Sequence, residues 1–316
     1  MRMTVIGTGY LGATHAVAMA ELGHEVLGVD VDQAKIDLLS AGQVPFHEPG
    51  LPELLRKHVA TGAVRFTTSY EEAGAFGDVH FIGVGTPQKR NGHAADMTYV
   101  DSAVEQISRA ATHDCVIAGK STVPVGSAAR LQELALTSAP SGTRVSLVWN
   151  PEFLREGHAV EDTLRPDRMV LGLEYDDAGR PTSAAQAAEA VLREVYAHQL
   201  EAGIPFIVTD YATAELVKVA ANSFLATKIS FINALSEITE TVGGDIRTLA
   251  DAIGLDERIG RKFLNAGVGF GGGCLPKDIR ALRARASELG LDQSLRFLAE
   301  VDDINLRRRE YTVQLA

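Results

Sequence analysis

Short runs of apolar residues alternate with amphipathic segments over roughly the first two hundred positions of the chain. The apolar runs predict β-strands at residues 3–7, 25–30, 64–68, 78–85, 115–120, 144–150 and 168–173. Apolar positions at helical spacing predict helices at residues 10–22, 32–40, 51–60, 98–111 and 126–138. Apolar strands that alternate with helices are typical of a parallel sheet covered on both faces. We therefore expect an α/β fold with a doubly wound parallel sheet.

The pattern changes near residue 205. Thr209-Asp210 offers an N-cap, and helical periodicity then runs from about Ala212 to Val242, where two glycines stop it. At 1.5 Å per residue this helix is about 45 Å long. Apolar residues lie on several of its sides, so something must bury it. We expect a partner subunit to do so, and a second domain of the same chain is the alternative.

The rest of the chain is helical in pattern, apart from a glycine-rich loop at residues 266–273. We therefore predict two domains, 1–205 and 206–316. The first is the Rossmann-like sheet domain, and the second is an all-helical central domain built on the long helix.

Composition narrows the functional classes. The 316 residues carry a formal net charge of −11, which argues against nucleic-acid binding. No apolar run approaches the roughly 18 residues of a membrane span. The two cysteines, Cys115 and Cys274, provide neither a disulfide framework nor metal-ligand spacing, and Cys115 is expected in the core. We expect a cytoplasmic protein with no metal site.

A glycine-rich turn follows the first predicted strand. Glycines at these spacings permit a tight turn, let the backbone approach a pyrophosphate, and open a helix whose N-terminus faces the phosphates. Asp30 ends the next strand, where its carboxylate accepts from a ribose 2′-OH and repels a 2′-phosphate, so NAD is favoured over NADP. Lys35 is placed to reach the same ribose or the phosphates. The predicted contacts in the turn are Gly7, Gly9, Tyr10, Leu11 and Gly12.

The sequence GFGGGCLPKD, residues 269–278, holds the most specific chemical signal. Cys274 lies among glycines that shield it poorly, and Lys277 is placed to favour its thiolate, which is the nucleophilic form. If a helix starts here, Asp278 shares a helical face with Cys274 and is placed to orient a water molecule. The alternative is a loop cysteine beside a capping aspartate.

Two further sets of polar residues suit catalysis. Lys218 and Asn222 project from one face of the long helix, where an ammonium and an amide together stabilise an oxyanion; the alternative is a solvated helix face. Glu152 and Glu156 follow a strand at the carboxyl edge of the sheet, where ligands bind in such folds, although surface glutamates usually have no such role. Thr86 and Thr122 also end strands at that edge.

Together these segments resemble the UDP-glucose/GDP-mannose dehydrogenase family over the whole chain. The residues that carry the resemblance are, in the family's order, GTGYLG, PFHEPGL, GVGTP, KSTVPVG, NPEFLREG, ELVKVAANSFLATKISFIN, DERIGRKFLNAGVGFGGGCLPKD and VDDINLRRR. NPEFLREGHAVEDTLRPDR together with GGGCLPKD is most similar to the branch that uses UDP-glucose.

The resemblance implies a role for each candidate residue. It implies that Cys274 is the nucleophile, that Lys218 and Asn222 stabilise the oxyanion, and that Asp278 activates the hydrolytic water. It places Glu152 and Thr122 on a catalytic water, and Thr86, Glu156 and Lys277 on the cofactor side. Its implied substrate contacts are Glu152, Phe153, Leu154, Arg155, Lys218, Asn222, Phe270 and Gly271, with Arg258 contributed across a dimer.

The implied reaction is the NAD-dependent, four-electron oxidation of the C6 alcohol of UDP-glucose to UDP-glucuronate. Cys274 captures the aldehyde as a thiohemiacetal, the second oxidation gives a thioester, and water releases the carboxylate. The implied assembly is a homodimer through the long helix. The alternatives are a GDP-mannose 6-dehydrogenase, a β-hydroxyacid dehydrogenase that transfers one hydride and needs no cysteine, and a non-catalytic dimeric NAD-binding fragment.

The resemblance departs from the family at the end of the chain. Family members continue into another Rossmann-like domain that grips the nucleotide, and the chain ends before it. We therefore expect the 316-residue chain to bind NAD and to show weak turnover or none.

Overall fold

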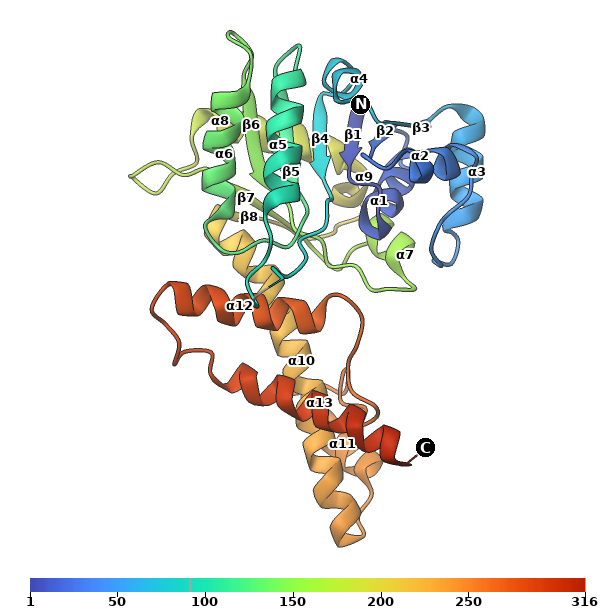
Figure 1. The fold of residues 1–316 in the computed structure, drawn as a ribbon, viewed down its shortest axis with the longest axis vertical. Helices are drawn as coiled ribbons and strands as arrows, with labels where there is room; N and C mark the ends of the chain where they lie inside the picture. The colour runs from blue at the N-terminus through green and yellow to red at the C-terminus, as the bar shows by residue number, and fades with distance from the viewer. Residues whose placement is uncertain (91, 316) are drawn as a thin grey trace. The chain divides into compact units, whose positions relative to one another are not determined.

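The computed structural model describes residues 1–90 and 92–315, which fold as two compact units. The first unit comprises Met1–Thr86 and Asp96–Leu216, and the second comprises Pro87–Ala95 and Val217–Ala316. The boundary between Leu216 and Val217 falls inside one long helix (Figure 1).

The first unit is built on an eight-stranded sheet with the order β3-β2-β1-β4-β5-β6-β7-β8. The order reverses between β1 and β4, so the loops that follow these two strands diverge at the carboxyl edge and leave room for a ligand. The strands are β1 (Arg2–Ile6), β2 (Glu25–Val29), β3 (Val64–Thr67), β4 (Val79–Ile82), β5 (Cys115–Gly119), β6 (Val145–Trp149), β7 (Met169–Leu173) and β8 (Phe206–Asp210).

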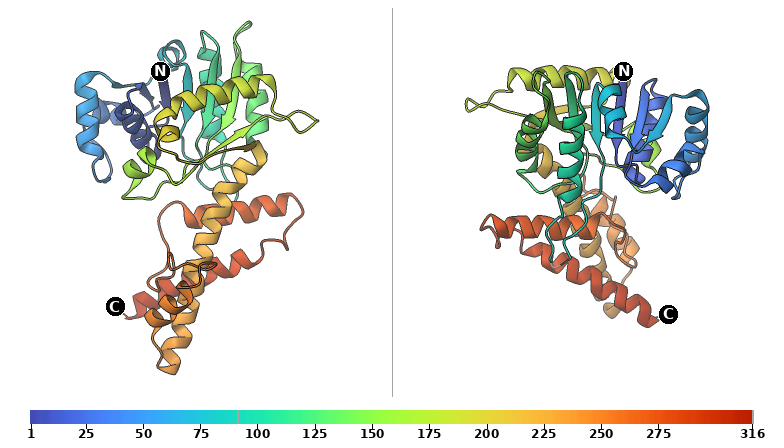
Figure 2. Two further views of the ribbon diagram at one scale, coloured as in Figure 1. Left: turned by 180° about the vertical axis from the view of Figure 1, so that it is seen from behind. Right: turned by 45° about the horizontal axis from the view of Figure 1, so that its top comes forward.

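Helices cover both faces of this sheet. In Figure 1, α5 and α6 lie in front of the strands, and the view from behind in Figure 2 shows α8 across the opposite face. α1 and α8 share one apolar cluster with the strands, which includes Met19, Phe81 and Leu192. The helices of this unit are α1 (Tyr10–Glu21), α2 (Gln33–Ser40), α3 (Leu51–Thr61), α4 (Tyr70–Phe76), α5 (Thr98–Ala110), α6 (Ser127–Ser138), α7 (Ala159–Leu164), α8 (Ser183–Val195) and α9 (Ala197–Glu201).

The doubly wound α/β fold is confirmed, but the sheet is not wholly parallel. β6 and β7 pair antiparallel through Trp149 and Gly172, whereas the other neighbouring strands pair parallel. The sequence pattern also missed β8, which closes the sheet beyond β7. β8 is an edge strand whose residues are half-buried or exposed, so it lacks the continuous apolar run that marks the central strands.

The second unit is built mainly on helices, and it also includes an isolated β-bridge between Gln88 and Ala95. The predicted long helix is α10 (Tyr211–Val242), and Asp210 caps it by accepting from the backbone N–H of Thr213 at 2.9 Å. The other helices are α11 (Ile246–Gly254), α12 (Leu275–Glu288) and α13 (Phe297–Leu315).

Two small apolar clusters hold these helices together. Ala226 of α10 packs with Ile279 of α12 and Leu298 of α13, and Ile232 packs with Ala250 of α11. None of the helices in the described part of the chain is long and apolar enough to cross a membrane.

Two buried histidines make the stability of the first unit sensitive to acid. Burial lowers the pKa of His80 to about 3 and holds the pKa of His15 well below its ordinary value. The folded unit therefore binds fewer protons than the unfolded chain at acidic pH, so the contribution of these histidines to stability is present above about pH 6.5 and is lost as the pH falls towards 3. For His80 the loss at pH 5.5 is on the order of 1 kcal/mol.

His80→Gln is therefore expected to weaken the pH dependence of unfolding. Between pH 7.5 and 5.5, the free energy of unfolding measured with urea should fall by about 1 kcal/mol less in this variant than in the parent. His47→Gln, at an exposed position, is the matched control. An unchanged pH dependence in His80→Gln would show that His80 is not held neutral.

Candidate functional site

The glycine turn after β1 has the geometry that close approach of a phosphate requires. An added Cβ at Gly12 would lie 1.8 Å from the carbonyl oxygen of Gly7, so no side chain fits between the turn and α1. At Gly9 an added Cβ would meet nothing within 4 Å, so space lies open in front of this residue. No side chain caps the N-terminus of α1, and its first turn contains no acidic residue. An anion therefore has both room and N–H donors here.

Asp30 lies at the end of β2 beside this turn and is 9 % exposed. Its carboxylate accepts from the backbone N–H of Thr8 at 2.9 Å and from Lys35 Nζ at 2.8 Å. Burial acts to raise the pKa of Asp30, but Lys35 and the amides of Asp32 and Thr8 outweigh it and hold the pKa below its ordinary value. Asp30 is thus held as an anion beside the glycine turn, and Lys35 pairs with this carboxylate.

Thr86 and Thr122, predicted from separate motifs, lie side by side. Thr86 Oγ1 donates to the carbonyl oxygen of Thr122 at 2.8 Å. Ser121 Oγ donates to the carbonyl oxygen of Val84 at 2.7 Å, so the loops after β4 and β5 are joined twice. The structure therefore brings these two candidate cofactor contacts together.

The segment from Glu152 to Gly157 follows β6 and is folded on itself. Glu152 accepts from the backbone N–H of Leu154, and Arg155 donates from its backbone N–H and its guanidinium to Asp162 in α7. The backbone N–H groups of Leu154 and Arg155, two of the predicted substrate contacts, are therefore already used inside the segment. Phe153 is covered by the guanidinium of Arg168, 3.8 Å from the ring centroid.

Two residues that the sequence pattern did not single out organise this edge of the sheet. Glu48, 1 % exposed, accepts from the hydroxyl of Tyr10 and from the backbone N–H groups of Gly157 and Ala159. Lys120, 8 % exposed, donates to the Asn150 side-chain oxygen at 3.0 Å. Glu48 lies in PFHEPGL and Lys120 in KSTVPVG, so the sequence shows that each motif carries a charged residue. It does not show that the charge is buried, and burial is the property that would have marked these residues as important.

Burial lowers the pKa of Lys120 to about 8, with the Glu152 carboxylate acting in the opposite direction. The rings of Phe81 and Tyr196 lie 5.6 and 5.8 Å from Lys120 Nζ, and Tyr196 donates to the same Asn150 oxygen at 2.6 Å. This cluster fixes the ends of β5 and β6, from which Thr122 and Glu152 project.

The second unit brings together most of the predicted reacting groups. Cys274 is exposed and is the N-cap residue of α12, and the backbone N–H of Asp278 donates to its carbonyl oxygen at 2.9 Å. The predicted helix start is thus confirmed. Asp278, 1 % exposed, accepts from Asn222 Nδ2 and from Lys277 Nζ, both at 2.6 Å.

The remaining predicted residues of this unit differ in exposure. Lys218 is 4 % exposed, so it does not belong to a solvated helix face. Phe270 is buried in the apolar cluster of α10, α12 and α13, and Asn305 holds its backbone with two hydrogen bonds of 2.7 and 3.0 Å. Gly271 is exposed, and Arg258 is an exposed side chain paired with Asp256.

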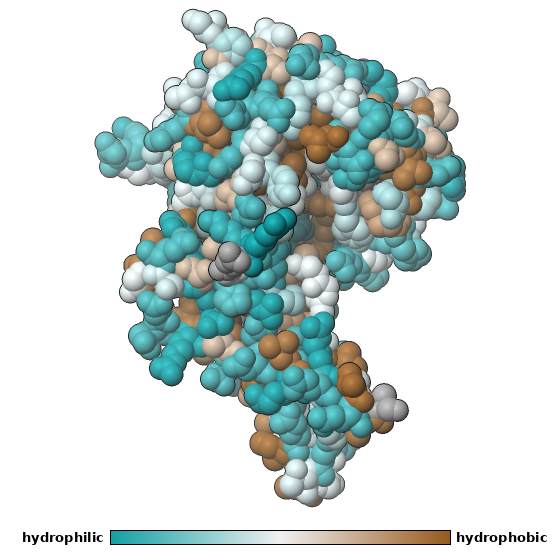
Figure 3. All heavy atoms as spheres, in the orientation of Figure 1, coloured by the Kyte–Doolittle hydropathy of each residue, from teal (hydrophilic) through white to brown (hydrophobic). Residues whose placement is uncertain are grey.

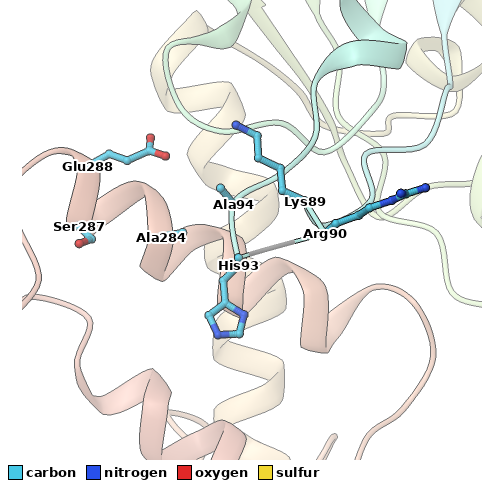
Figure 4. A pocket seen from close by; sticks show the side chains of 8 residues that line it. Lys89, Arg90, His93, Ala94, Ala284, Ser287 and Glu288 are labelled. Atoms are coloured by element: carbon cyan, nitrogen blue, oxygen red, sulfur yellow. The ribbon is translucent and has the colours of Figure 1, made fainter.

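A cavity of about 610 Å³ lies elsewhere in this unit, beside α12 (Figure 4). Lys89, His93 and Glu288 line it, and none of the predicted catalytic residues does. It is therefore separate from the Cys274 loop. The described residues contain no cluster of three or more side chains able to hold a metal ion.

Comparison with known families matches both parts of the chain. The NAD binding domain of the UDP-glucose/GDP-mannose dehydrogenase family matches residues 1–200, and the central domain of that family matches residues 212–307. A UDP-glucose 6-dehydrogenase of Bacillus subtilis is 42 % identical over 316 residues, which are 100 % of this chain and 68 % of the relative.

Solved structures match the fold as well as the sequence. A UDP-glucose dehydrogenase from Pyrobaculum islandicum matches with a TM-score of 0.89 at 38 % identity, over 99 % of this chain and 69 % of the other. A GDP-mannose dehydrogenase from Pseudomonas aeruginosa matches with a TM-score of 0.75 at 34 % identity, over 98 % and 69 %. The chain thus spans about two thirds of the length of these proteins.

Gly9→Ala separates cofactor binding from folding. The added methyl meets open space in the protein, so the melting temperature should stay within about 2 °C of the parent. The methyl occupies the space in front of the α1 amides, so NAD affinity measured by calorimetry should fall at least about tenfold, or about 1.4 kcal/mol. Gly267→Ala, also at an open position, is the control. NAD binding of parental strength in Gly9→Ala would place the cofactor elsewhere.

Proposed function

The chain belongs to the UDP-glucose/GDP-mannose dehydrogenase family, and on this premise we propose that it oxidises the C6 alcohol of UDP-glucose to UDP-glucuronate. The observation that carries the proposal is the exposed Cys274 at the start of α12, one helical turn from a buried Asp278. An oxidation that stops at an aldehyde needs no nucleophile, whereas an oxidation that continues to a carboxylate gains from a covalent thioester. We also propose a cytoplasmic location, which suits two cysteines without a disulfide framework.

The residues of the first unit fit NAD, the cofactor of this family. The open space at Gly9 and the uncapped α1 amides suit the pyrophosphate, and the Asp30 carboxylate suits a ribose hydroxyl. Asp30 repels a 2′-phosphate, although Lys35 reduces that repulsion. NAD, when bound, accepts a hydride in each of two successive oxidations of the same carbon.

Cys274 carries the covalent part of the proposed reaction. After the first oxidation, its thiolate adds to the C6 aldehyde and the new oxyanion takes a proton, which gives a thiohemiacetal. The second oxidation removes the remaining hydride and the hydroxyl proton, which leaves a thioester. Water then adds to the thioester carbonyl, the C–S bond breaks, and the carboxylate leaves while the thiolate is restored.

Lys218, Asn222 and Asp278 are proposed to serve the oxyanion and the water. Asn222 is fixed by its hydrogen bond to Asp278, so the amide is held in one orientation without further loss of side-chain freedom. Lys218 is buried, and a buried ammonium stabilises an anion more strongly than a solvated one. Lys277, assigned to the cofactor side, donates to the Asp278 carboxylate at 2.6 Å.

The proposed roles of residues in the first unit are those predicted from the sequence. Glu152 and Thr122 hold a catalytic water, Glu156 and Thr86 lie on the cofactor side, and Tyr10 and Leu11 follow the phosphate turn. For the substrate we retain the predicted contacts, which are Phe153, Leu154, Arg155, Phe270, Gly271 and, from a partner subunit, Arg258. The backbone N–H groups of Leu154 and Arg155 already donate to Glu152 and Asp162 within that part of the chain.

UDP-glucose is favoured as the substrate because relatives named for it share 42 % and 38 % identity with this chain, against 34 % for the GDP-mannose enzyme. GDP-mannose is the second candidate, since that enzyme shares the same fold.

A homodimer through α10 is also proposed. Phe224, Phe231 and Ile238 recur every seven residues and are 66, 53 and 60 % exposed, so they form a stripe along one side of the helix. Figure 3 shows apolar surface exposed on the helical unit. A contiguous exposed apolar stripe is characteristic of a protein interface.

The stoichiometry of NADH tests the reaction. However slow its turnover, the parent protein supplied with NAD and UDP-glucose should form two NADH per sugar consumed, and Cys274→Ser should form little or none because an oxygen ester is not expected to form and hydrolyse in place of the thioester. Cys115→Ser, at a buried position, is the control for loss of a thiol. One NADH per sugar would contradict the thioester route, and turnover only with GDP-mannose would move the protein to the second candidate.

Phe231→Glu tests the interface. A charge in the centre of the stripe should shift the protein from dimer to monomer at micromolar concentration, as measured by sedimentation equilibrium, because an unpaired buried carboxylate is costly. Leu136→Glu, an equally exposed apolar position on α6, should leave the dimer intact. A monomeric parent, or a dimeric Phe231→Glu variant, would contradict the proposed interface.

A further inference from the structure

We propose that Glu48 is a positioning residue for this reaction: its buried carboxylate holds the segment from Glu152 to Val160 against the dinucleotide-binding turn. The inference rests on the proposed function, because this segment carries the glutamates and backbone groups assigned above to the water, the nicotinamide side and the nucleotide sugar. Glu48 itself touches neither ligand in this assignment.

Four donors converge on the Glu48 carboxylate, which is 1 % exposed. One oxygen accepts from the backbone N–H groups of Ala159 at 2.8 Å and Val160 at 3.4 Å. The other accepts from the backbone N–H of Gly157 at 3.0 Å and from the Tyr10 hydroxyl. These donors come from positions 38 and more than 100 residues away in the sequence, so a single side chain joins three separate segments.

No lysine or arginine in the described part of the chain pairs with Glu48, so the N–H and O–H groups alone compensate its charge. A buried carboxylate in this setting is stable only while the donors stay in place, and loss of any one of them leaves a desolvated anion. The same requirement acts in the other direction, because the three amides lose their acceptor if the carboxylate leaves. The carboxylate and the segment therefore stabilise each other's position.

Tyr10 extends this link to the cofactor side. It is the first residue of α1 and follows Gly9 directly. Burial and the hydrogen bond to Glu48 raise the pKa of the Tyr10 hydroxyl above its ordinary value, so it remains a donor. The hydroxyl also accepts from the backbone N–H of Gly157 at 3.0 Å. The side chains of Tyr10 and Glu48 therefore connect the glycine turn to the segment.

Hydrogen bonds within the segment connect its residues to one another, so that Glu48 holds the segment as a unit. Arg155 pairs with Asp162 of α7, and the Glu152 carboxylate accepts from the backbone N–H of Leu154. These contacts connect residues between positions 152 and 162 to one another. Gly157 has φ +85°, a conformation that allows the turn whose N–H faces Glu48. If the hydrogen bonds to Glu48 are lost, the segment moves as a unit, and the groups assigned to substrate binding move with it.

Glu48→Gln is the direct test. The substitution removes the charge and turns an NH₂ group towards N–H donors, while it keeps the size of the side chain. We expect the KM for UDP-glucose to rise at least tenfold, with the NAD dissociation constant within threefold of the parent and a smaller change in kcat. Hydrogen exchange of the Gly157 and Ala159 amides, measured without ligands, should accelerate at least tenfold.

Glu53→Gln is the matched control, because Glu53 is an exposed residue of neighbouring α3 whose carboxylate pairs with Arg56. Tyr10→Phe, which removes one donor and leaves the carboxylate, covers the case in which Glu48→Gln fails to fold; it should raise the same KM and speed exchange at Gly157. Combined with Glu48→Gln, it should add less than twofold to the KM, since both act through one carboxylate.

A KM for UDP-glucose within twofold of the parent in Glu48→Gln, despite faster exchange, would overturn the positioning role. A parent protein that neither binds nor oxidises UDP-glucose would instead overturn the proposed function. In that case the exchange rates decide the inference separately, because unchanged protection of Gly157 and Ala159 in Glu48→Gln would show that the carboxylate does not hold the segment.

Discussion

Buried carboxylates and the N–H groups that they must accept from determine how the functional segments of this protein are arranged. Asp30, Glu48, Glu215 and Asp278 are each at least nine-tenths buried. Removing a carboxylate from water is costly unless protein donors replace the water. Glu215 illustrates this at the start of α10, where it accepts from the backbone N–H groups of Gly126 and Ala128 at 2.7 and 2.6 Å, beyond the loop that carries Thr122.

Glycine supplies a second constraint, because some backbone segments approach their neighbours too closely for a side chain. Gly12 leaves no room for a side chain beside the Gly7 carbonyl, and an added Cβ at Gly269 would lie 2.3 Å from the Asn305 side-chain oxygen. Asn305 in turn holds the backbone of Phe270, four residues before Cys274. The cysteine loop is thus anchored at one end by α13 and at the other by the start of α12, although glycines lie around the thiol.

The two units balance burial differently. In the sheet unit even charged and ring side chains are buried where partners exist, as Lys120 is against Asn150 and the ring of Phe81. In the helical unit α10 buries Lys218 and Asn222 on one side and exposes Phe224 and Phe231 on another. A polar buried side and an apolar exposed side on one helix favour a reaction centre next to a protein interface.

Sequence alone determined the features that depend on neighbours along the chain. Apolar periodicity predicted the central strands and α10, and glycine spacing predicted the turn after β1, because both follow from local geometry. The antiparallel β6–β7 pair, the edge strand β8 and the role of Glu48 were decided by tertiary structure. Glu48 accepts a hydrogen bond from the backbone N–H of Gly157, 109 positions away. Such a pairing depends on which surfaces pack together in the folded chain, and the spacing of residues in the sequence does not encode this. The sequence likewise identified Asn222 and Asp278 as separate candidates, and only the fold brought the Asn222 amide into hydrogen-bond contact with Asp278.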